Sequence, residues 1–428
     1  MPNCCAEFKT LMESEAYHQQ PQRSKPKRRK QSNQNSSYKI PTLPVELIIE
    51  ILSRLPVKSL LKFRCVSRPW RCLISSRKFI KAHLNAFTNN KDSTHHSRLL
   101  LRFVQPHHHL MDCSIRSLLY DSDPKIFQLS YPMQNPRKSF KILGSVNGLI
   151  CFSSESDLFL WNPSIRKFKK FRDPQSGYYF HGFGYDQLRD DYKLVIISPK
   201  EVRIYSSNSD SWRIIVHDRQ YGLFREDEGI FVNGKLHWAN SPSQDEHWDI
   251  ICIDVTDEKW GKVEKPFYGE GDFDLTLSMG VLGNDLSILC NNQSLQTHVW
   301  IMKEYGIKES WTKMYTINRS YNSRYFSPLF CKMSNKGEIL IQLNQSTFMI
   351  YDPKNDSIIC QKVTITDYPF WEAGIYMNES LVWPISQKGM MQRGVKLRSL
   401  KKLTRVEQRL QQPRRWEIPN EANHAFNI

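Results

Sequence analysis

The sequence predicts a multidomain α + all-β chain, in which a small three-helix module near the N-terminus precedes a β-propeller. Three observations predict this organisation. Residues 40–84 carry apolar side chains at helical spacing between prolines, and residues 98–384 alternate short apolar runs with Gly, Asn, Asp and Pro. In this second region two sequence landmarks also recur with a period of about 45 residues, which is typical of the blades of a propeller.

The segment before the helical module, residues 1–39, is rich in Gln, Ser, Asn, Lys and Arg, so we expect a disordered basic lead-in. Its cluster "RSKPKRRK", Arg23–Lys30, is a candidate nuclear-localisation signal, with a solvated basic tail as the alternative. The N-terminus has no apolar core of a secretory signal, and no apolar run approaches the ~20 residues of a transmembrane helix. We therefore expect localisation in the nucleus and cytoplasm, and no membrane partner.

The formal net charge of +17 is concentrated near the two ends of the chain. Arg23–Lys30 and the basic residues between Lys388 and Arg415 supply most of it, so the central region is nearly neutral. A nearly neutral domain is not a basic platform for nucleic acid, and no specific nucleic acid is expected as a partner. None of the ten cysteines forms a C-x-x-C pair, so neither a zinc ribbon nor a disulfide framework is indicated.

The helical module shows the start and stop signals of three short helices. Pro44 suits a first helical turn, where its missing N–H costs nothing. An apolar stripe follows it: Leu47, Ile48, Ile51, Leu52 and Leu55. Pro56 ends this helix and opens the next, and Ser67 is a candidate cap for a third helix with Pro69 in its first turn. A further short helix is predicted over residues 79–84.

The stretch from Leu43 to Ser75 has more apolar side chains than three short helices can cover by packing on each other. An apolar surplus of this kind marks an interaction surface. Each aliphatic side chain that becomes fully buried contributes about 1.5–3 kcal/mol. The sequence therefore predicts that a partner protein covers part of this module.

After a polar linker, residues 85–97, the two landmarks begin. The first is a turn followed by an apolar strand, and it recurs at Leu149, Leu194, Leu236, Leu286, Ile339 and Leu381. The second is a strand end, a polar turn and a bulky residue, and it recurs at Phe168, Trp212, Trp260, Trp311 and Ile358. Each period reads as one small antiparallel sheet that must stack on its neighbours to cover both faces, which a closed propeller achieves. A β-sandwich is the alternative.

The tail, residues 385–428, is basic and places Leu397, Leu400, Leu403, Val406 and Leu410 at helical spacing. It reads as a basic amphipathic helix for a membrane surface or an acidic partner, or as a solvated tail.

The segment "IPTLPVELIIEILSRLPVKSLLKFRCVSRPWRCLIS" resembles an F-box in the form common in plants. The motifs "SVNGLICF", "LWNPSIRKFKKF", "GFGYD", "FVNGKLHWA" and "IYDPKNDSI" are similar to the F-box-associated, kelch-like domains that follow plant F-boxes. The resemblance covers residues 40–84 and 98–384. The usual family ending is shorter than the tail of this chain.

This resemblance implies the substrate-recognition subunit of an SCF-type ubiquitin ligase. The F-box would dock a Skp-type adaptor and, through it, a cullin, while the β domain would present an unknown protein substrate for ubiquitination. Such a receptor is not an enzyme and needs no cofactor, because it acts by positioning its target. The residues implied in adaptor binding, or in holding its frame, are Leu43, Pro44, Ile48, Ile51, Leu52, Leu60, Leu61 and Trp70.

Two alternatives remain on the sequence alone: a propeller-fold enzyme, and a nucleic-acid-binding protein acting through its basic tails. Support for an enzyme is thin, because the histidines at 95–96 and 107–109 lack metal-site spacing, and "GFGYD" lacks the continuation of a phosphate loop. The residues that bind the target are unknown. Two long insertions, Ser241–Asp249 and Asn318–Pro328, are candidates and read equally well as ordinary surface loops.

Overall fold

A computed structural model describes the helical module and the strands of the β domain. The described residues are 43–88, 97–103, 109–132, 139–155, 157–172, 180–199, 201–216, 223–224, 227–241, 248–267, 276–291, 296–318, 327–332, 337–342, 347–362, 372–376 and 379–384. The predicted lead-in, residues 1–39, and the predicted tail, residues 385–428, lie outside them.

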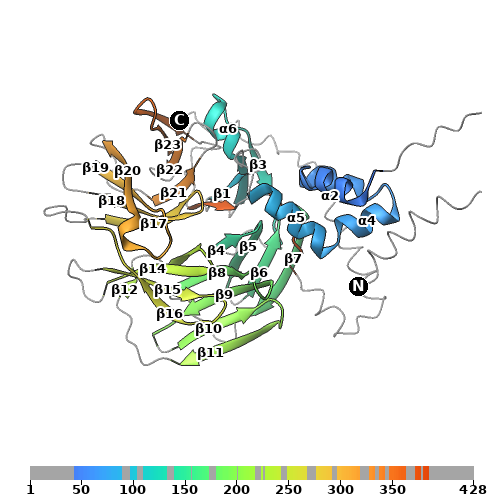
Figure 1. The fold of residues 1–428 in the computed structure, drawn as a ribbon, viewed down its shortest axis with the longest axis horizontal. Helices are drawn as coiled ribbons and strands as arrows, with labels where there is room; N and C mark the ends of the chain where they lie inside the picture. The colour runs from blue at the N-terminus through green and yellow to red at the C-terminus, as the bar shows by residue number, and fades with distance from the viewer. Residues whose placement is uncertain are drawn as a thin grey trace, which may run out of the picture. The chain divides into compact units, whose positions relative to one another are not determined.

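Four helices make up the helical module, and prolines or serines stand where each of the first three begins (Figure 1). They are α2 (Val45–Ser53), α3 (Val57–Phe63), α4 (Arg68–Ile74) and α5 (Arg77–Thr88). Pro44 and Pro56 are the N-cap residues of α2 and α3, with ψ of 143° and 146°. The Ser67 hydroxyl accepts a hydrogen bond from the Trp70 backbone N–H at 3.4 Å, so the predicted cap is confirmed. Helix α5 continues four residues into the segment predicted as a linker.

The strands form six blades within the described residues, each antiparallel. Blade A holds, in sheet order, β25 (Glu372–Tyr376), β1 (Arg98–Phe103), β2 (His109–Ser114) and β3 (Ile126–Leu129), with α6 (Ile115–Tyr120) after β2. Blade B holds β4 (Lys141–Val146), β5 (Leu149–Ser154), β6 (Asp157–Asn162) and β7 (Lys167–Arg172). Blade C holds β8 (Phe180–Asp186), β9 (Asp191–Ile197), β10 (Glu201–Ser206) and β11 (Ser211–Val216).

The other three blades follow the same plan. Blade D holds β13 (Glu228–Val232), β14 (Lys235–Ser241), β15 (Asp249–Asp254) and β16 (Trp260–Val263), with β12 (Leu223–Phe224) beside β14. Blade E holds β17 (Thr276–Leu282), β18 (Asp285–Asn291), β19 (Gln296–Met302) and β20 (Trp311–Asn318), with a 3₁₀ turn, η2 (Lys308–Ser310), before β20. Blade F holds β21 (Ser327–Lys332), β22 (Ile339–Gln342), β23 (Thr347–Asp352) and β24 (Ser357–Lys362).

The blades close into a ring. Strand β25 pairs with β1 in register from Arg98↔Tyr376 to Arg102↔Glu372, so blade A is completed by a strand from the far end of the domain. The first strands of successive blades, β4, β8, β13, β17, β21 and β25, each contact the next, and β25 contacts β4 (Figure 1). Strands β8 and β13 also share a short parallel pairing. The predicted propeller is confirmed.

Each pair of neighbouring blades shares one hydrophobic cluster, six clusters in all among the described residues. In β9, Leu194 and Ile196 pack toward blade B, whereas Val195 and Ile197 pack toward blade D. Because both faces of a blade are covered, every residue of β9 is buried. This explains why many strands read as continuous apolar runs rather than as alternating ones.

Five of the six leucine or isoleucine landmarks lie in the second strand of blades B to F, and they are at most 1% exposed. The five bulky landmarks lie at the beginning of the outer strands β7, β11, β16, β20 and β24. The sixth, Leu381, differs: the described residues 379–384 that contain it form no strand. Blade A takes its second strand from β1 instead, so this landmark has no sheet to enter.

The polar turns that the sequence shows between third and fourth strands have a shared geometry. Asn162 and Asp254 each accept hydrogen bonds from the backbone N–H groups two and three residues later. The residue four positions later, Arg166 or Glu258, has a positive φ of 53° or 62°. An Asx side chain thus replaces the missing backbone partners and starts the turn, which is why Asn and Asp recur there.

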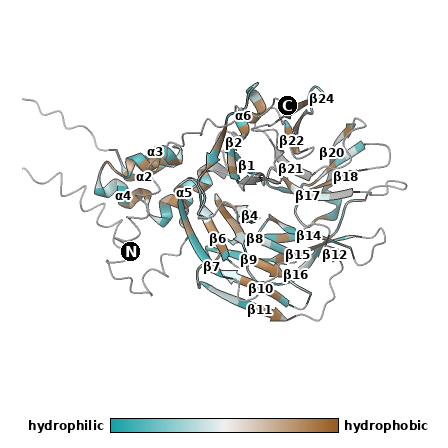
Figure 2. Cartoon of the chain, turned by 180° about the vertical axis from the view of Figure 1, so that it is seen from behind, coloured by the Kyte–Doolittle hydropathy of each residue, from teal (hydrophilic) through white to brown (hydrophobic). Residues whose placement is uncertain are grey.

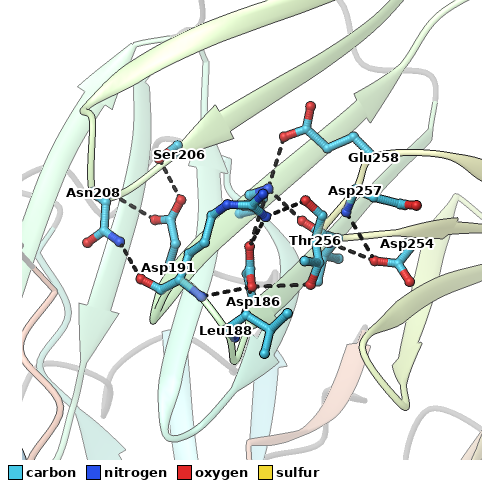
Figure 3. A network of polar contacts seen from close by, with 12 residues as sticks. Asp186, Leu188, Asp191, Ser206, Asn208, Asp254, Thr256, Asp257 and Glu258 are labelled. Carbon is cyan, nitrogen blue, oxygen red and sulfur yellow. Dashed lines mark hydrogen bonds and ion pairs between the residues drawn. The ribbon is translucent and has the colours of Figure 1, made fainter.

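Polar contacts join the turns of blades C and D (Figure 3). The carboxylate of Asp186 accepts from the Thr256 hydroxyl at 3.2 Å and from the Arg189 guanidinium at 3.0 Å. Lys193 donates to the Val255 carbonyl and forms an ion pair with Glu258 at 2.9 Å. All of these groups have partners within the fold, so the cluster holds two blades together.

The motif "GFGYD" forms strand β8 rather than a phosphate loop. A Cβ atom on Gly182 would lie 2.8 Å from the Leu236 side chain of the next blade. Glycine fits here because the side chains of β14 in the next blade pack directly against this position. Within the described part of the chain, no helix is both long and apolar enough to cross a membrane.

Candidate docking surface

The helical module has a small core of its own. The buried residues are Leu52, Val57, Leu60, Leu73, Ile74 and Phe79, together with Leu381 from the end of the β domain. Phe63 and Trp70 border this core in an edge-to-face pair with ring centroids 5.6 Å apart. Ile48, Leu55 and Leu61 are half-buried against it. The core therefore uses one side of α2, α3 and α4, and exposed side chains remain on their other sides.

Apolar side chains remain on the outside of the module. Figure 2 shows hydrophobic and hydrophilic residues along each of the helices α2 to α4. We call Leu43, Pro44, Leu47, Ile51 and Val66 the exposed apolar set. Leu43 and Ile51 are each 53% exposed, and Val66 is 67% exposed. Leu47 and Ile51 are four residues apart on α2 and therefore share one helix face. The predicted surplus is thus real within the described residues of the module.

The structure separates the eight predicted binding residues into three groups. Leu43, Pro44 and Ile51 are exposed; Ile48, Leu61 and Trp70 are half-buried; Leu52 and Leu60 lie in the core. Leu52 and Leu60 therefore serve the core of the module, and the role of all eight in adaptor binding stays a prediction. Two exposed residues, Leu47 and Val66, were not among the eight. The i, i+4 spacing of Leu47 and Ile51 was the signal that could have identified Leu47.

A basic hollow lies on α3, α4 and the connection between them. It has a volume of about 410 Å³ and is lined by Leu61, Arg64, Cys65, Ser67, Arg68 and Arg71. Burial, and then the neighbouring charge of Arg71, lowers the pKa of Arg64 from its ordinary value. The guanidinium groups are thus close enough to repel one another.

The segment after β25 enters the core of the helical module. We call residues 379–382 the clasp. Leu381 belongs to the core of the module, whereas Val382 belongs to the cluster shared by blades B and C. From the other side, Ile80 and Leu84 of α5 pack against that same blade cluster. One short segment therefore contributes to both cores.

Charged groups add to this contact. The Asp190 carboxylate, in the β8–β9 turn, forms ion pairs with Arg77 and, at 3.4 Å, with Lys81, both of α5. Burial alone would raise the pKa of Asp190, but the hydrogen bond from the Tyr185 hydroxyl and the charges of Arg77 and Lys81 hold this pKa below its ordinary range. The side chains are partly exposed, so we ascribe to them orientation rather than much stability.

The described ranges contain no metal-binding arrangement of side chains, since no cluster of three or more His, Cys, Asp or Glu there could hold a metal ion. Burial raises the pKa of the Cys113 thiol to about 12, so this buried cysteine stays protonated. Of the predicted histidine clusters only His109 is described, and it lies in β2. Most of both candidate target loops, 241–249 and 318–328, lies outside the described residues.

Comparison with known proteins gives matches over both modules. Residues 40–82 match the F-box domain, and residues 104–380 match the F-box associated beta propeller domain. An F-box/kelch-repeat protein of Arabidopsis thaliana is 32% identical over 64% of this chain and 79% of its own length. The F-box protein CPR1 of the same plant is 29% identical over 73% of this chain and 82% of its own length.

Among solved structures, TolB from Acinetobacter baumannii aligns over 72% of this chain and 73% of its own, with 11% identity and a TM-score of 0.42. That likeness is too weak to bear on function. The family match, by contrast, covers most of the β domain, and the F-box match covers the module that carries the exposed apolar set. This chain therefore belongs to the plant F-box proteins that carry an F-box-associated β-propeller domain.

Proposed function

We propose that this chain is the substrate-recognition subunit of an SCF-type ubiquitin ligase. The F-box would bind a Skp-type adaptor and, through it, a cullin, and the propeller would hold a protein target. The exposed apolar set carries the proposal: it lies on a folded module whose core is already complete, so its apolar side chains are left for a partner. F-box and F-box-associated domains in one chain support a substrate-adaptor type of role.

In this role the chain is a non-catalytic receptor. Holding a target lysine near a ubiquitin thioester raises its effective concentration, and no side chain of this protein has to form a covalent bond. The basic cluster Arg23–Lys30 supports a localisation of the protein in the nucleus as well as in the cytoplasm. Substituting its lysines by alanine in a fluorescent fusion should shift the protein toward the cytoplasm, and an unchanged distribution would refute that signal.

The adaptor proposal is tested by binding of the purified full chain to a recombinant plant Skp-type adaptor. We expect Leu47→Asp/Ile51→Asp to reduce affinity at least about 100-fold, because two apolar contacts worth about 1.5–3 kcal/mol each are lost. Leu188→Asp is the matched control, since Leu188 is 85% exposed on the propeller. The double substitution Leu43→Ala/Pro44→Ala should weaken binding in the same way. If the wild-type chain does not bind the adaptor, the proposed function is wrong.

A further inference from the structure

The basic hollow on α3 and α4 is unusual in its charge. Arg64 is half-buried at its edge, whereas Arg68 and Arg71 are exposed. Its lining also includes the apolar side chain of Leu61 and the thiol of Cys65. Three arginines thus line a partly apolar hollow, and one of them is partly buried.

No carboxylate within the described residues forms an ion pair with these arginines, although the nearby Arg54 and Arg77 do form ion pairs. Residues 51–88 contain nine Lys and Arg but no Asp or Glu. The two acids of the module, Glu46 and Glu50, lie on α2, and Glu50 already pairs with Arg54. Burial lowers the pKa of Arg64 first, and the charge of Arg71 lowers it further. An anion that entered the hollow would relieve the repulsion between these two charges.

We propose that the basic hollow binds carboxylate side chains of an acidic segment of the Skp-type adaptor. This inference rests on the proposed function and adds to it a charged contact beside the exposed apolar set. Val66, which is 67% exposed, stands in the chain between Cys65 and Ser67 of the hollow, so apolar and basic contacts are adjacent. Guanidinium groups bind carboxylates in a bidentate fashion, and interfaces combine an apolar centre with a charged rim.

The features of the site favour a protein over a nucleic acid. A backbone of phosphates is normally followed by an extended basic groove with aromatic side chains for stacking. Here the arginines surround a single hollow, and its neighbour is the aliphatic Val66. A protein partner can fit both parts of this surface, because its carboxylates can bind the arginines while its apolar side chains cover Val66.

Association kinetics with the recombinant adaptor test the inference, using the purified full chain. The variant is Arg68→Glu/Arg71→Glu. The matched control is Lys62→Glu/Lys78→Glu, which changes the net charge equally at exposed positions outside the hollow. At ~50 mM NaCl we expect the arginine variant to associate about tenfold more slowly than the control. The difference should shrink at ~0.5 M NaCl, where the Debye length is only a few ångströms.

One further variant and one further measurement distinguish a loss of binding from a loss of folding. Arg68→Gln/Arg71→Gln removes charge without reversing it, and it should show a smaller loss with the same salt dependence. Thermal melting of each variant shows whether the module still folds, and a loss that is independent of salt in both variants would overturn the inference.

Equal effects of the arginine and lysine variants would also overturn it, because net charge alone would then explain the binding. So would unchanged adaptor kinetics together with weakened binding of a single-stranded RNA probe. In these cases the wild-type chain still binds the adaptor, and the proposed function stands. If the wild-type chain does not bind it, both ideas are wrong.

Discussion

The side-chain amide of Asn162 donates a hydrogen bond to the backbone carbonyl of Val382 at 2.8 Å, although 220 residues separate the two. The same amide lies 3.0 Å from the Ser380 carbonyl and hydroxyl. Its oxygen accepts from the backbone N–H groups of Ser164 and Ile165. Asn162 is fully buried. One side chain therefore both shapes a turn of blade B and fixes the clasp.

Replacing Asn162 should destabilise the protein. We expect Asn162→Ala to lower the free energy of unfolding by about 2–4 kcal/mol, because buried carbonyls of the clasp lose their donor. Asn355→Ala is the matched control: Asn355 occupies the corresponding turn of blade F, is exposed, and should change stability by less than about 0.5 kcal/mol. Urea denaturation measures both, and equal values for the two variants would contradict this role.

Leu381 should stabilise the F-box, although it lies far from the F-box in the sequence. We expect Leu381→Ala to cost about 2–5 kcal/mol, because it leaves a cavity in the core of the helical module. Limited proteolysis should then cut within residues 43–88 before it cuts the propeller. Leu188→Ala, at an exposed position, controls for loss of a leucine. Cleavage that begins in the propeller would argue against a shared core.

Ring closure predicts a sharp dependence on where the chain is truncated. A protein ending at Pro384 keeps β25 and the clasp, whereas one ending at residue 371 loses both. We expect the first to unfold cooperatively and the second to aggregate, because β1 becomes an open apolar edge. Circular dichroism melts and gel filtration measure this. A soluble, cooperatively unfolding protein of residues 1–371 would show that the closing strand is dispensable.

Two buried histidines should make stability depend on pH. Burial lowers the pKa of His237 to about 4 and that of His181 to about 3, against about 6.5 in an unfolded chain. The unfolded chain therefore takes up protons that the native protein does not. The free energy of unfolding should fall as pH decreases from about 6.5 to about 4, by up to about 1.4 kcal/mol per pH unit for each histidine.

His237 offers the cleaner test of this dependence. The Ile230 carbonyl accepts from its Nδ1–H at 3.1 Å, which leaves Nε2 to accept from the Tyr305 hydroxyl at 2.6 Å. The neutral ring is thus fully hydrogen-bonded. Urea denaturation between pH 7.5 and 4.5 should show a shallower slope for His237→Gln than for the wild type. Identical slopes would mean that this ring is protonated in the native state.

Much of the fold was predictable because short sequence patterns of turns and strands indicate where most blades begin and end. Polar turns with Asn or Asp, followed by bulky residues such as Trp212 and Trp260, marked the outer strands correctly. Leu381 carries the same local signal and forms no strand, since the sheet position that it would take is filled by β1. A pattern within ten residues cannot show which distant segment has already occupied a site.

The sequence could also not show which apolar residues of the docking surface are exposed. Ile51 and Leu52 are adjacent and equally apolar, yet one is 53% exposed and the other 3%. Which of the two faces the core depends on the direction from which α5 and the clasp approach α2, and the sequence of α2 does not contain that information. The basic hollow was missed for a related reason: Arg64 and Arg68 come together across a break between two helices.

The pairing of β25 with β1 also constrains how the protein is made. Roughly 270 residues separate Phe103 from Glu372, so at ribosomal speeds β1 waits on the order of tens of seconds for its partner. The F-box waits as long for Leu381. Until then the nascent chain exposes the core of the helical module, which lacks Leu381, and the apolar edge of β1, which lacks β25. We expect chaperones to protect both. Both segments find their partners once residues 372–382 leave the exit tunnel, so the pace of translation sets when the F-box and the propeller can complete their folds.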